Sequence, residues 1–350
     1  MEGLYSALVH DSAYVFSGKL LNLYQCLYYT VFIFFIVITL NFFIPRIGVE
    51  DPAERYYPPQ GNLTDTEYSI IKQLTRKQYG FDVSGWQQYL RYLSQLSRGD
   101  LGTSLQAGSP KVSTLIAQRL PWTLVLSLSN MLLSVTLGLL LGTSAAWNRG
   151  KFADRALMNA STVMTALPAF FLALVFSLYM GFEWGWFPAY TEPDMVASFD
   201  WSWRAIAQVA RNAALPVISM SIGGVISYAQ GTRNSVIAVS QEDFITTARA
   251  KGMSTRTVKY RHVLRNAMLP IVTSLGMSVS GLIGGSVVIE QIFNWNGMGT
   301  LFLTANNTND YPLMMGIMLF LSSFALLANL VTDLLYSLLD PRVSAGGGRR

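Results

Sequence analysis

The stretch FITTARAKGMSTRTVKYRHVLRNAMLP, residues 244–270, is far more basic than the chain around it. The chain has 25 Lys and Arg residues in all, and seven of them lie between Arg233 and Arg265. The runs on either side, 213–230 and 270–289, contain no Asp, Glu, Lys or Arg. A short basic segment between two apolar runs is typical of a loop that joins two membrane spans on the cytoplasmic side.

The composition of the whole chain supports this interpretation. Hydrophobic residues make up 51% of the chain, charged residues 13%, and the mean hydropathy is +0.34. Crossing the hydrocarbon core of a bilayer takes about 20 mostly apolar residues, and six runs are long enough. We therefore predict an all-α integral membrane protein with six transmembrane helices and a folded extracytoplasmic segment between the first two. The predicted spans are 23–44, 122–146, 156–181, 213–230, 270–289 and 313–338.

The basic residues also predict the orientation of the chain. Three of them follow the second predicted span, seven follow the fourth, and three more follow the sixth. The two short loops on the opposite side contain only Arg204 and Arg211. Because positive charge accumulates on the cytoplasmic side, we expect the loop 231–269, the tail 339–350 and both termini to be cytoplasmic.

The beginning of the chain supports two interpretations. The leader 1–22 has apolar residues loosely near helical spacing, so it is either a helix lying along the inner membrane surface or a frayed terminus. The first span has no evident small-residue cleavage site, which predicts an uncleaved anchor. Cys26 is the only cysteine, so no disulfide can form within the chain.

The outer segment 45–121 carries the signals of folded structure. Two capping boxes, Thr64 with Glu67 and Ser84 with Gln87, each precede a stretch with helical periodicity. They predict helices over 65–79 and 85–96, and the glycines of RGDLGTSL, 98–105, predict a tight loop after them. Its aromatic residues either contact another protein or pack within the chain; they include Trp86, Tyr89 and Tyr92.

Two helices are predicted within the basic loop 231–269. Ser240 and Asp243 match a capping box, which would start the first helix at Gln241. Gly252 would end that helix in the left-handed conformation, with the next residue folding back onto Ala248.

The second helix of the loop begins directly after this turn. Ser254 or Thr255 is expected to cap it, and Pro270 is expected in the first turn of the fifth span, where its missing N–H costs nothing. The loop is therefore predicted to be short, rigid and basic.

Several stretches resemble those of one known family. The resemblance is carried by ARAKG (248–252), RHVLRNAMLP (261–270), RGDLGTSL (98–105), QRLPWTLVL (118–126), GGSVVIEQIFNWNGMG (284–299), DYPLMMGIML (310–319) and NLVTDLLYSLLDPR (329–342). The chain is similar to permeases of ATP-binding-cassette importers, in the dipeptide and oligopeptide branch, from about residue 23 to 342. The general loop pattern of the family is Glu-Ala-Ala, three residues, then Gly. Here Thr246, Thr247 and Ala248 stand at the first three positions, and Asn296 stands where the family commonly has Pro.

The resemblance implies a type I importer fold and a prokaryotic inner-membrane location. It implies a second, homologous permease subunit, two cytoplasmic ATPase subunits and an extracytoplasmic substrate-binding protein. ATP and Mg²⁺ would bind to the ATPase, and no cofactor to this chain. The expected cargo is oligopeptide, with nickel chelates or oligosaccharides as alternatives.

The resemblance also implies which residues couple the chain to its ATPase. They are Phe244, Ile245, Thr246, Thr247, Ala248, Arg249, Ala250, Lys251, Gly252 and Met253. The apolar side chains at 244, 245, 248 and 253 are expected to face a groove on the ATPase. Arg249 and Lys251 would then meet acidic groups at its rim. The alternative for any single basic residue is contact with phospholipid.

The sequence lacks the residues that two other classes of membrane protein need, the ion-coupled secondary transporters and the membrane-anchored enzymes. Within the predicted spans the sequence has few ionisable residues, namely Asp333 and, at the end of the fifth span, Glu290, whereas an ion-coupled secondary transporter generally needs carboxylates near the midplane. A membrane-anchored enzyme lacks support because His10 and His262 are the only histidines and no metal-ligand spacing or phosphate-binding loop is present. No catalytic, metal or substrate-binding residue is predicted.

Glu290 is left with two interpretations. It either pairs with a basic group at a subunit interface, a structural role that we favour, or lies at an outer gate. Asp333 is a candidate partner of Arg233. In the fifth span Gly276, Ser280 and Gly284 recur every four residues, which predicts a packing surface.

Overall fold

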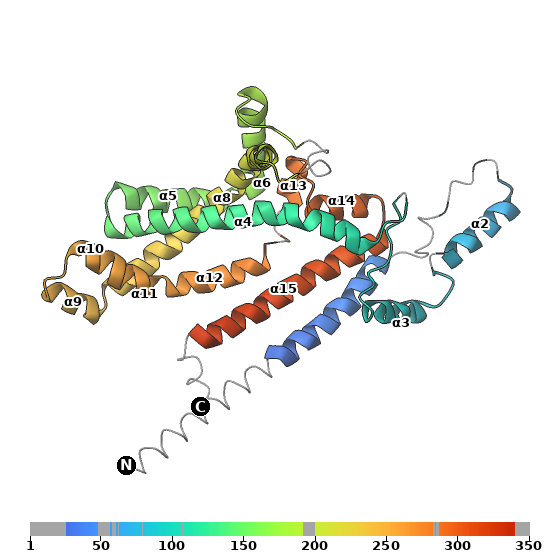
Figure 1. The fold of residues 1–350 in the computed structure, drawn as a ribbon, viewed down its shortest axis with the longest axis horizontal. Helices are drawn as coiled ribbons and strands as arrows, with labels where there is room; N and C mark the ends of the chain where they lie inside the picture. The colour runs from blue at the N-terminus through green and yellow to red at the C-terminus, as the bar shows by residue number, and fades with distance from the viewer. Residues whose placement is uncertain are drawn as a thin grey trace, which may run out of the picture. The chain divides into compact units, whose positions relative to one another are not determined.

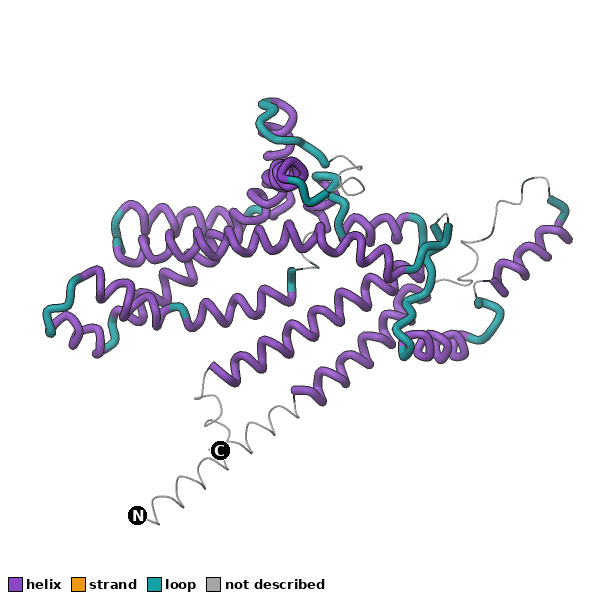
Figure 2. Tube along the Cα trace, viewed as in Figure 1, coloured by secondary structure: helices purple, strands orange, loops and turns teal. Residues whose placement is uncertain are grey.

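The computed structural model describes residues 26–47, 57, 61, 63–78, 80–106, 108–191, 200–282, 284 and 287–339. The leader 1–22, and the tail beyond residue 339, lie outside them. The described residues are helices joined by short loops, with an isolated β-bridge between Thr103 and Lys111 (Figures 1 and 2). The chain divides into two compact units. The first comprises Met1–Tyr29, Arg119–Thr300 and Phe324–Arg350, and the second comprises Thr30–Gln118 and Leu301–Ser323.

The second unit is built around aromatic residues. It contains most of the first apolar helix, Cys26–Arg46, together with α2 (Asp65–Gln78), α3 (Gly85–Leu96) and the first part of α15 (Tyr311–Leu339). Phe42 is 1% exposed, and its ring centre lies 5.3 Å from that of Tyr89 and 5.5 Å from that of Tyr92. Met315 packs against the same group, and the Asn41 side chain donates to its carbonyl oxygen at 2.8 Å. The first apolar helix, α3 and α15 therefore share one core.

Both helices predicted in the outer segment are present, and both capping boxes are confirmed. The Thr64 hydroxyl accepts from the N–H of Glu67, whose carboxylate accepts from the N–H of Thr64 at 2.9 Å. Ser84 and Gln87 make the same reciprocal pair, and α3 has the predicted bounds. Of the three aromatic candidates, Tyr89 and Tyr92 pack in the core described above. The side chain of Trp86 is 62% exposed.

The predicted tight loop is held by two aspartates. The Asp100 carboxylate accepts from the N–H of Gly102 at 2.9 Å, and Gly102 has φ +83°, a left-handed conformation that favours glycine. Asp310 is 1% exposed and accepts from the hydroxyl of Ser104 in this loop. Its other oxygen accepts from the N–H of Leu313 at 3.1 Å, so Asp310 also caps the start of α15.

Most of the other helices lie in the first unit. In chain order, the helices from residue 112 to residue 307 are α4 (Val112–Trp147), α5 (Phe152–Ala166), α6 (Ala169–Phe176), the π-helix Ser177–Glu183, α8 (Trp203–Ser240), α9 (Asp243–Ala250), α10 (Thr255–Thr257), the π-helix Val258–Leu264, α11 (Arg265–Ala267), α12 (Leu269–Ser280), α13 (Val287–Ile292) and α14 (Met298–Asn307). The start of α4, up to Gln118, and the part of α14 from Leu301 onward belong to the second unit. Among the described residues, four helices are long and apolar enough to span a membrane, or five if one bent pair counts as a span.

Close contact between α4 and α8 depends on glycine. A Cβ atom added at Gly142 would lie 2.3 Å from the carbonyl oxygen of Ala229, and one added at Gly138 would lie 2.5 Å from the Cβ of Tyr228. Small residues at these positions let two helix backbones approach closely without a clash. In the fifth predicted span, Gly276 similarly faces Thr332 of α15, so part of the predicted small-residue surface packs within the chain.

The third and fifth predicted spans are not continuous helices. The prediction of one helix over 156–181 is wrong, because α5 ends before Leu167 and the chain bends by 96° at the break. Pro168 follows directly, and the residue before a proline is disfavoured in the helical conformation. In the fifth predicted span, α12 ends at Ser280 and α13 begins at Val287.

Candidate functional site

The basic loop folds as predicted except at its first residues. The expected capping box at Ser240 is wrong, because Ser240 is the last residue of α8 and its hydroxyl donates to the carbonyl oxygen of Ile237 at 2.8 Å. The next helix, α9, begins at Asp243, after Glu242 at the N-cap position, where no side chain caps it. The acidic residue in its first turn still suits the positive end of the helix dipole.

The end of α9 is confirmed in detail. Gly252 has φ +75° and is the left-handed residue of the turn. Its N–H donates to the carbonyl oxygen of Arg249 at 3.0 Å, and the N–H of Met253 donates to that of Ala248 at 3.3 Å. These are the two hydrogen bonds of a Schellman motif. The chain therefore reverses immediately after α9.

A second helical stretch then leads into the fifth predicted span. Ser254 caps it through its hydroxyl, which accepts from the N–H of Thr257 at 3.3 Å. The stretch runs through α10, a π-helical turn and α11, and Pro270 lies in the first turn of α12, as predicted. The helix, sharp turn and second helix of the loop are thus present (Figure 1).

One face of α9 is buried in the chain itself. We call this hydrophobic group the α9 cluster. Its buried members are Ala146, Val236, Ile245, Ala248, Val258, Val263 and Ala267. Ile245 is 0% exposed and Ala248 is 6% exposed. The prediction that these two side chains face a groove on another protein is therefore wrong, because they anchor α9 to α8 and to the second helical stretch.

The rest of the surface of α9 is exposed, including both flanks of the buried face. Phe244 is 44% exposed and Met253 is 40% exposed, and the remaining candidates outside the α9 cluster are exposed as well. Those remaining candidates are Thr246, Thr247, Arg249, Ala250, Lys251 and Gly252. Neither Arg249 nor Lys251 forms an ion pair with a residue that the structure describes. Together, α9 and the turn after it therefore present two large apolar side chains and two cationic groups at the surface of this chain.

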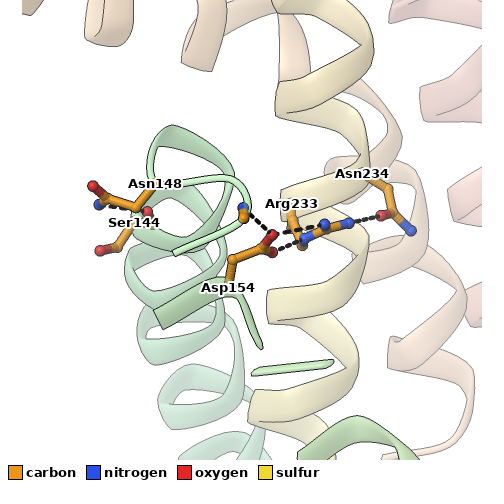
Figure 3. Close-up of polar contacts among 6 residues, drawn as sticks. Ser144, Asn148, Asp154, Arg233 and Asn234 are labelled. Atoms are coloured by element: carbon orange, nitrogen blue, oxygen red, sulfur yellow. Dashed lines mark hydrogen bonds and ion pairs between the residues drawn. The ribbon is translucent and has the colours of Figure 1, made fainter. Parts of the chain in front are cut away.

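The first turn of α5, directly after the turn 148–151 that joins it to α4, contacts α8 through a partly buried ion pair. The Nε of Arg233 on α8 donates to one oxygen of Asp154, and a terminal nitrogen donates to the other at 3.2 Å (Figure 3). The N–H of Gly150 also donates to the carboxylate of Asp154, at 2.8 Å. The Asp154 side chain is 7% exposed and that of Arg233 is 16% exposed. Arg233 thus pairs with Asp154, whereas the side chain of Asp333, its predicted candidate partner, lies outside the part of the chain that the structure describes.

Both members of this pair lie outside the predicted spans 156–181 and 213–230. The guanidinium of Arg233, and after it the N–H of Gly150, hold the pKa of Asp154 at about 2, below its ordinary value of 3.8. The same contact raises the pKa of Arg233. Both groups are therefore charged at physiological pH.

Glu290 lies in a second polar site, far from α9 in the sequence. It is 0% exposed, and its carboxylate accepts from the hydroxyl of Thr123 at 2.8 Å and from the N–H of Gly299 at 2.7 Å. The Thr123 hydroxyl accepts in turn from the N–H of Met298 at 2.7 Å. Both residues thus satisfy free N–H groups at the start of α14. These contacts give Glu290 a structural role within the chain, while its predicted pairing with a basic group at a subunit interface stays a prediction.

Sequence reasoning missed the roles of three residues in these contacts, Thr123, Asp154 and Asp310. Asp310 had a local signal, because an aspartate directly before Tyr-Pro matches a helix cap. Thr123 and Asp154 had none, because their partners are distant in the sequence. No group of three or more His, Cys, Asp or Glu residues able to hold a metal ion occurs among the described residues.

Comparison with known proteins identifies the family. Residues 135–345 match the family described as binding-protein-dependent transport system inner membrane component. The chain belongs to this family. The matched region contains α5 to α14, and with them the exposed face of α9. The resemblance to importer permeases is thereby confirmed, and this inner membrane component is a multi-pass membrane protein of a transport system.

Individual relatives extend the similarity to most of the chain. The oligopeptide transport system permease protein OppB of Haemophilus influenzae is 34% identical over 311 residues, 88% of this chain and 94% of the relative. AppB of Bacillus subtilis, which has the same description, is 32% identical over 304 residues, 87% and 93% of the two chains. The glutathione transport system permease protein GsiC of Salmonella paratyphi A is 33% identical over 308 residues, 88% and 94%.

Proposed function

We propose that this inner membrane component forms half of the translocation pathway of an ATP-driven importer of oligopeptides. Two of its relatives are named for oligopeptide transport and one for transport of glutathione, itself a small peptide. A homologous permease subunit supplies the other half. An extracytoplasmic binding protein delivers the cargo, and two cytoplasmic ATPase subunits bind ATP and Mg²⁺, while this chain binds no cofactor.

Six membrane crossings follow if both broken helices count as spans. Four helices are long enough to cross alone, the bent pair of α5 and α6 supplies a fifth crossing, and α12 with α13 supplies the sixth. Breaks within a span are tolerated where neighbouring helices or a water-filled cavity satisfy the free backbone groups. The basic loop, the tail and both termini are then cytoplasmic in a prokaryotic inner membrane, and 45–121 is extracytoplasmic, where the exposed Trp86 is available to the binding protein.

The observation that carries the proposal is the division of α9 into a buried face and an exposed face. The Schellman turn at Gly252 and the α9 cluster hold the helix firmly on α8. Its other face offers Phe244 and Met253 as apolar contacts, with Arg249 and Lys251 beside them. A rigid helix of this kind can transmit movement of an ATPase to the spans, whereas a flexible loop would absorb it.

A pair of phenylalanine substitutions tests the proposal. Phe244→Asp places a charge on the exposed face of α9 without entering the α9 cluster. We expect it to weaken association with the ATPase subunits by about tenfold, since loss of an apolar anchor typically costs more than 1 kcal/mol. Co-purification of the ATPase with the tagged permease, and uptake of labelled peptide, measure the effect.

Phe152→Asp is the matched control, because Phe152 is 83% exposed and is the first residue of α5 rather than a part of α9. It is expected to retain the ATPase. If the Phe244→Asp protein inserted normally and retained both the ATPase and peptide uptake, α9 would not be the contact with the ATPase.

A further inference from the structure

The end of α4, directly before the turn 148–151, is connected to the α9 cluster at more than one point. Ala146, near the end of α4, is a buried member of the cluster, and Trp147 packs against it. The ammonium group of Lys259, on the second helical stretch of the loop, lies 5.4 Å from the centre of the Trp147 ring. The end of α4 therefore shares one hydrophobic cluster with both helical stretches of the basic loop, independently of the ion pair.

The ion pair lies next to this cluster on α8. Arg233 precedes Val236 and Ile237 by three and four residues, the spacing that places side chains on the same helix face. Val236 is buried in the α9 cluster, and Ile237 packs against it. Asp154 thus binds α8 at Arg233, within one helical turn of Val236 and Ile237, which pack in the α9 cluster.

The geometry of the ion pair indicates that it fixes the orientation of the two helices, in addition to holding them together. A buried ion pair is rarely the most stable way to join two helices, because apolar residues of similar volume often serve as well or better. A guanidinium that meets both oxygens of a carboxylate, however, fixes direction as well as distance. The contact between Asp154 and Arg233 can therefore hold the turn between α4 and α5 at one angle to α8.

We propose that Asp154 and Arg233 are a positioning pair that makes the α4–α5 turn move as one body with α8 and α9. The inference rests on the proposed function, in which α9 receives movement from an ATPase. Through this pair the movement reaches α4 and α5 together with α8, rather than α8 alone. The pair α4 and α5 would then move together with α8 when the ATPase moves α9.

Substitutions in the assembled transporter test the pair. Asp154→Asn and Arg233→Gln each remove one charge, and Arg233→Lys keeps the charge but loses the two-pronged contact. We expect each to lower the ratio of ATPase activity with and without loaded binding protein by about fivefold or more, the usual scale of coupling between sites. The double variant Asp154→Asn/Arg233→Gln is expected to lose no more than the worse single variant, because the residues act together. Arg155→Gln is the matched control, since Arg155 is the exposed neighbour of Asp154.

A purely structural pair would give a different result. The single variants would then lower the yield or heat stability of the complex and leave the activity ratio unchanged, which would overturn the proposal. Additive losses in the double variant would also overturn it. Arg233→Lys keeps the test decisive if the variants with a single buried charge fail to fold.

A distance measurement separates this proposal from the one on which it rests. Spin labels at Phe152→Cys and Thr255→Cys, in a chain with Cys26→Ser, report the separation of the α4–α5 turn from the basic loop; both sites are exposed. We expect the same distance with and without ATP in the parent protein and a broader distribution in Asp154→Asn. A parent distance that changes with ATP would refute the pair as a rigid link. An unchanged activity ratio in Phe244→Asp would instead refute the role of α9.

Discussion

Substitution of Gly142 by alanine tests the packing of α4 against α8. The added Cβ would lie 2.3 Å from the carbonyl oxygen of Ala229 and 2.7 Å from the Cβ of Thr232. Neither atom can move aside by a side-chain rotation, so the two helices must separate or distort. Overpacking of this kind typically costs about 1–3 kcal/mol.

Gly223 on α8 provides the matched control. No atom lies within 4 Å of a Cβ built at this position, so alanine meets no obstacle there. Alanine also favours a helix over glycine by about 1 kcal/mol, so the two glycine-to-alanine changes should have opposite signs.

Thermal stability of the purified transporter in detergent measures both changes. After heating, the fraction that still elutes as an intact complex gives an apparent melting temperature. A change of 1 kcal/mol shifts the melting temperature of a domain of 150–250 residues by about 2–4 °C, and that of a longer chain by less. Gly142→Ala should therefore lower the apparent melting temperature by a few degrees, and Gly223→Ala should leave it unchanged or raise it. A Gly142→Ala protein as stable as the parent would show that α4 and α8 are not in contact at this point.

Three further outcomes are expected. In a cysteine-free background, Ser94→Cys should react with an impermeant maleimide in intact cells, and Phe152→Cys only after permeabilisation; the reverse pattern would exclude the proposed orientation. Gly252→Asp should abolish peptide uptake but not insertion, because φ +75° disfavours a side chain and the new charge opposes the helix dipole, a local cost of roughly 1–2 kcal/mol. Gly185 has a similar φ of +61° but lies away from α9, so Gly185→Asp should retain peptide uptake. An equal loss of uptake in the two variants would indicate misfolding. Asp310→Ala should lower the apparent melting temperature, because it leaves buried hydrogen-bond donors without an acceptor, at a cost of about 1–3 kcal/mol. An unchanged melting temperature would contradict the capping role of Asp310.

Features set by neighbouring residues could be predicted from the sequence. The capping box of Ser84 with Gln87 and the left-handed turn at Gly252 each depend on side chains within one helical turn. The same local pattern failed at Ser240 because α8 was still continuing there, so the hydroxyl bonded backwards to Ile237. A capping pattern therefore identifies a helix start only if the preceding chain is not already helical.

Features that depend on distant contacts could not be predicted. The apolar run 213–230 locates α8, but the helix has 38 residues and continues on both sides of the run into more polar sequence, where hydropathy gives no signal. Pro168 did carry a local warning of the break after α5, which the apolar composition of 156–181 outweighed. Arg233 and Asp154 are 79 positions apart, and nothing in the sequence prefers Asp154 over Asp333 as the partner.

A synthetic peptide copied from residues 241–253 would make a poor competitive inhibitor of ATPase docking. The helix it would have to form has eight residues, and isolated helices shorter than about 12–15 residues are marginal in water. In the permease, Ile245 and Ala248 pack in a cluster with side chains of α4, α8 and the second helical stretch of the loop, which the peptide would lack. An inhibitor would need a covalent staple in place of those two residues, leaving Phe244 and Arg249 free to bind.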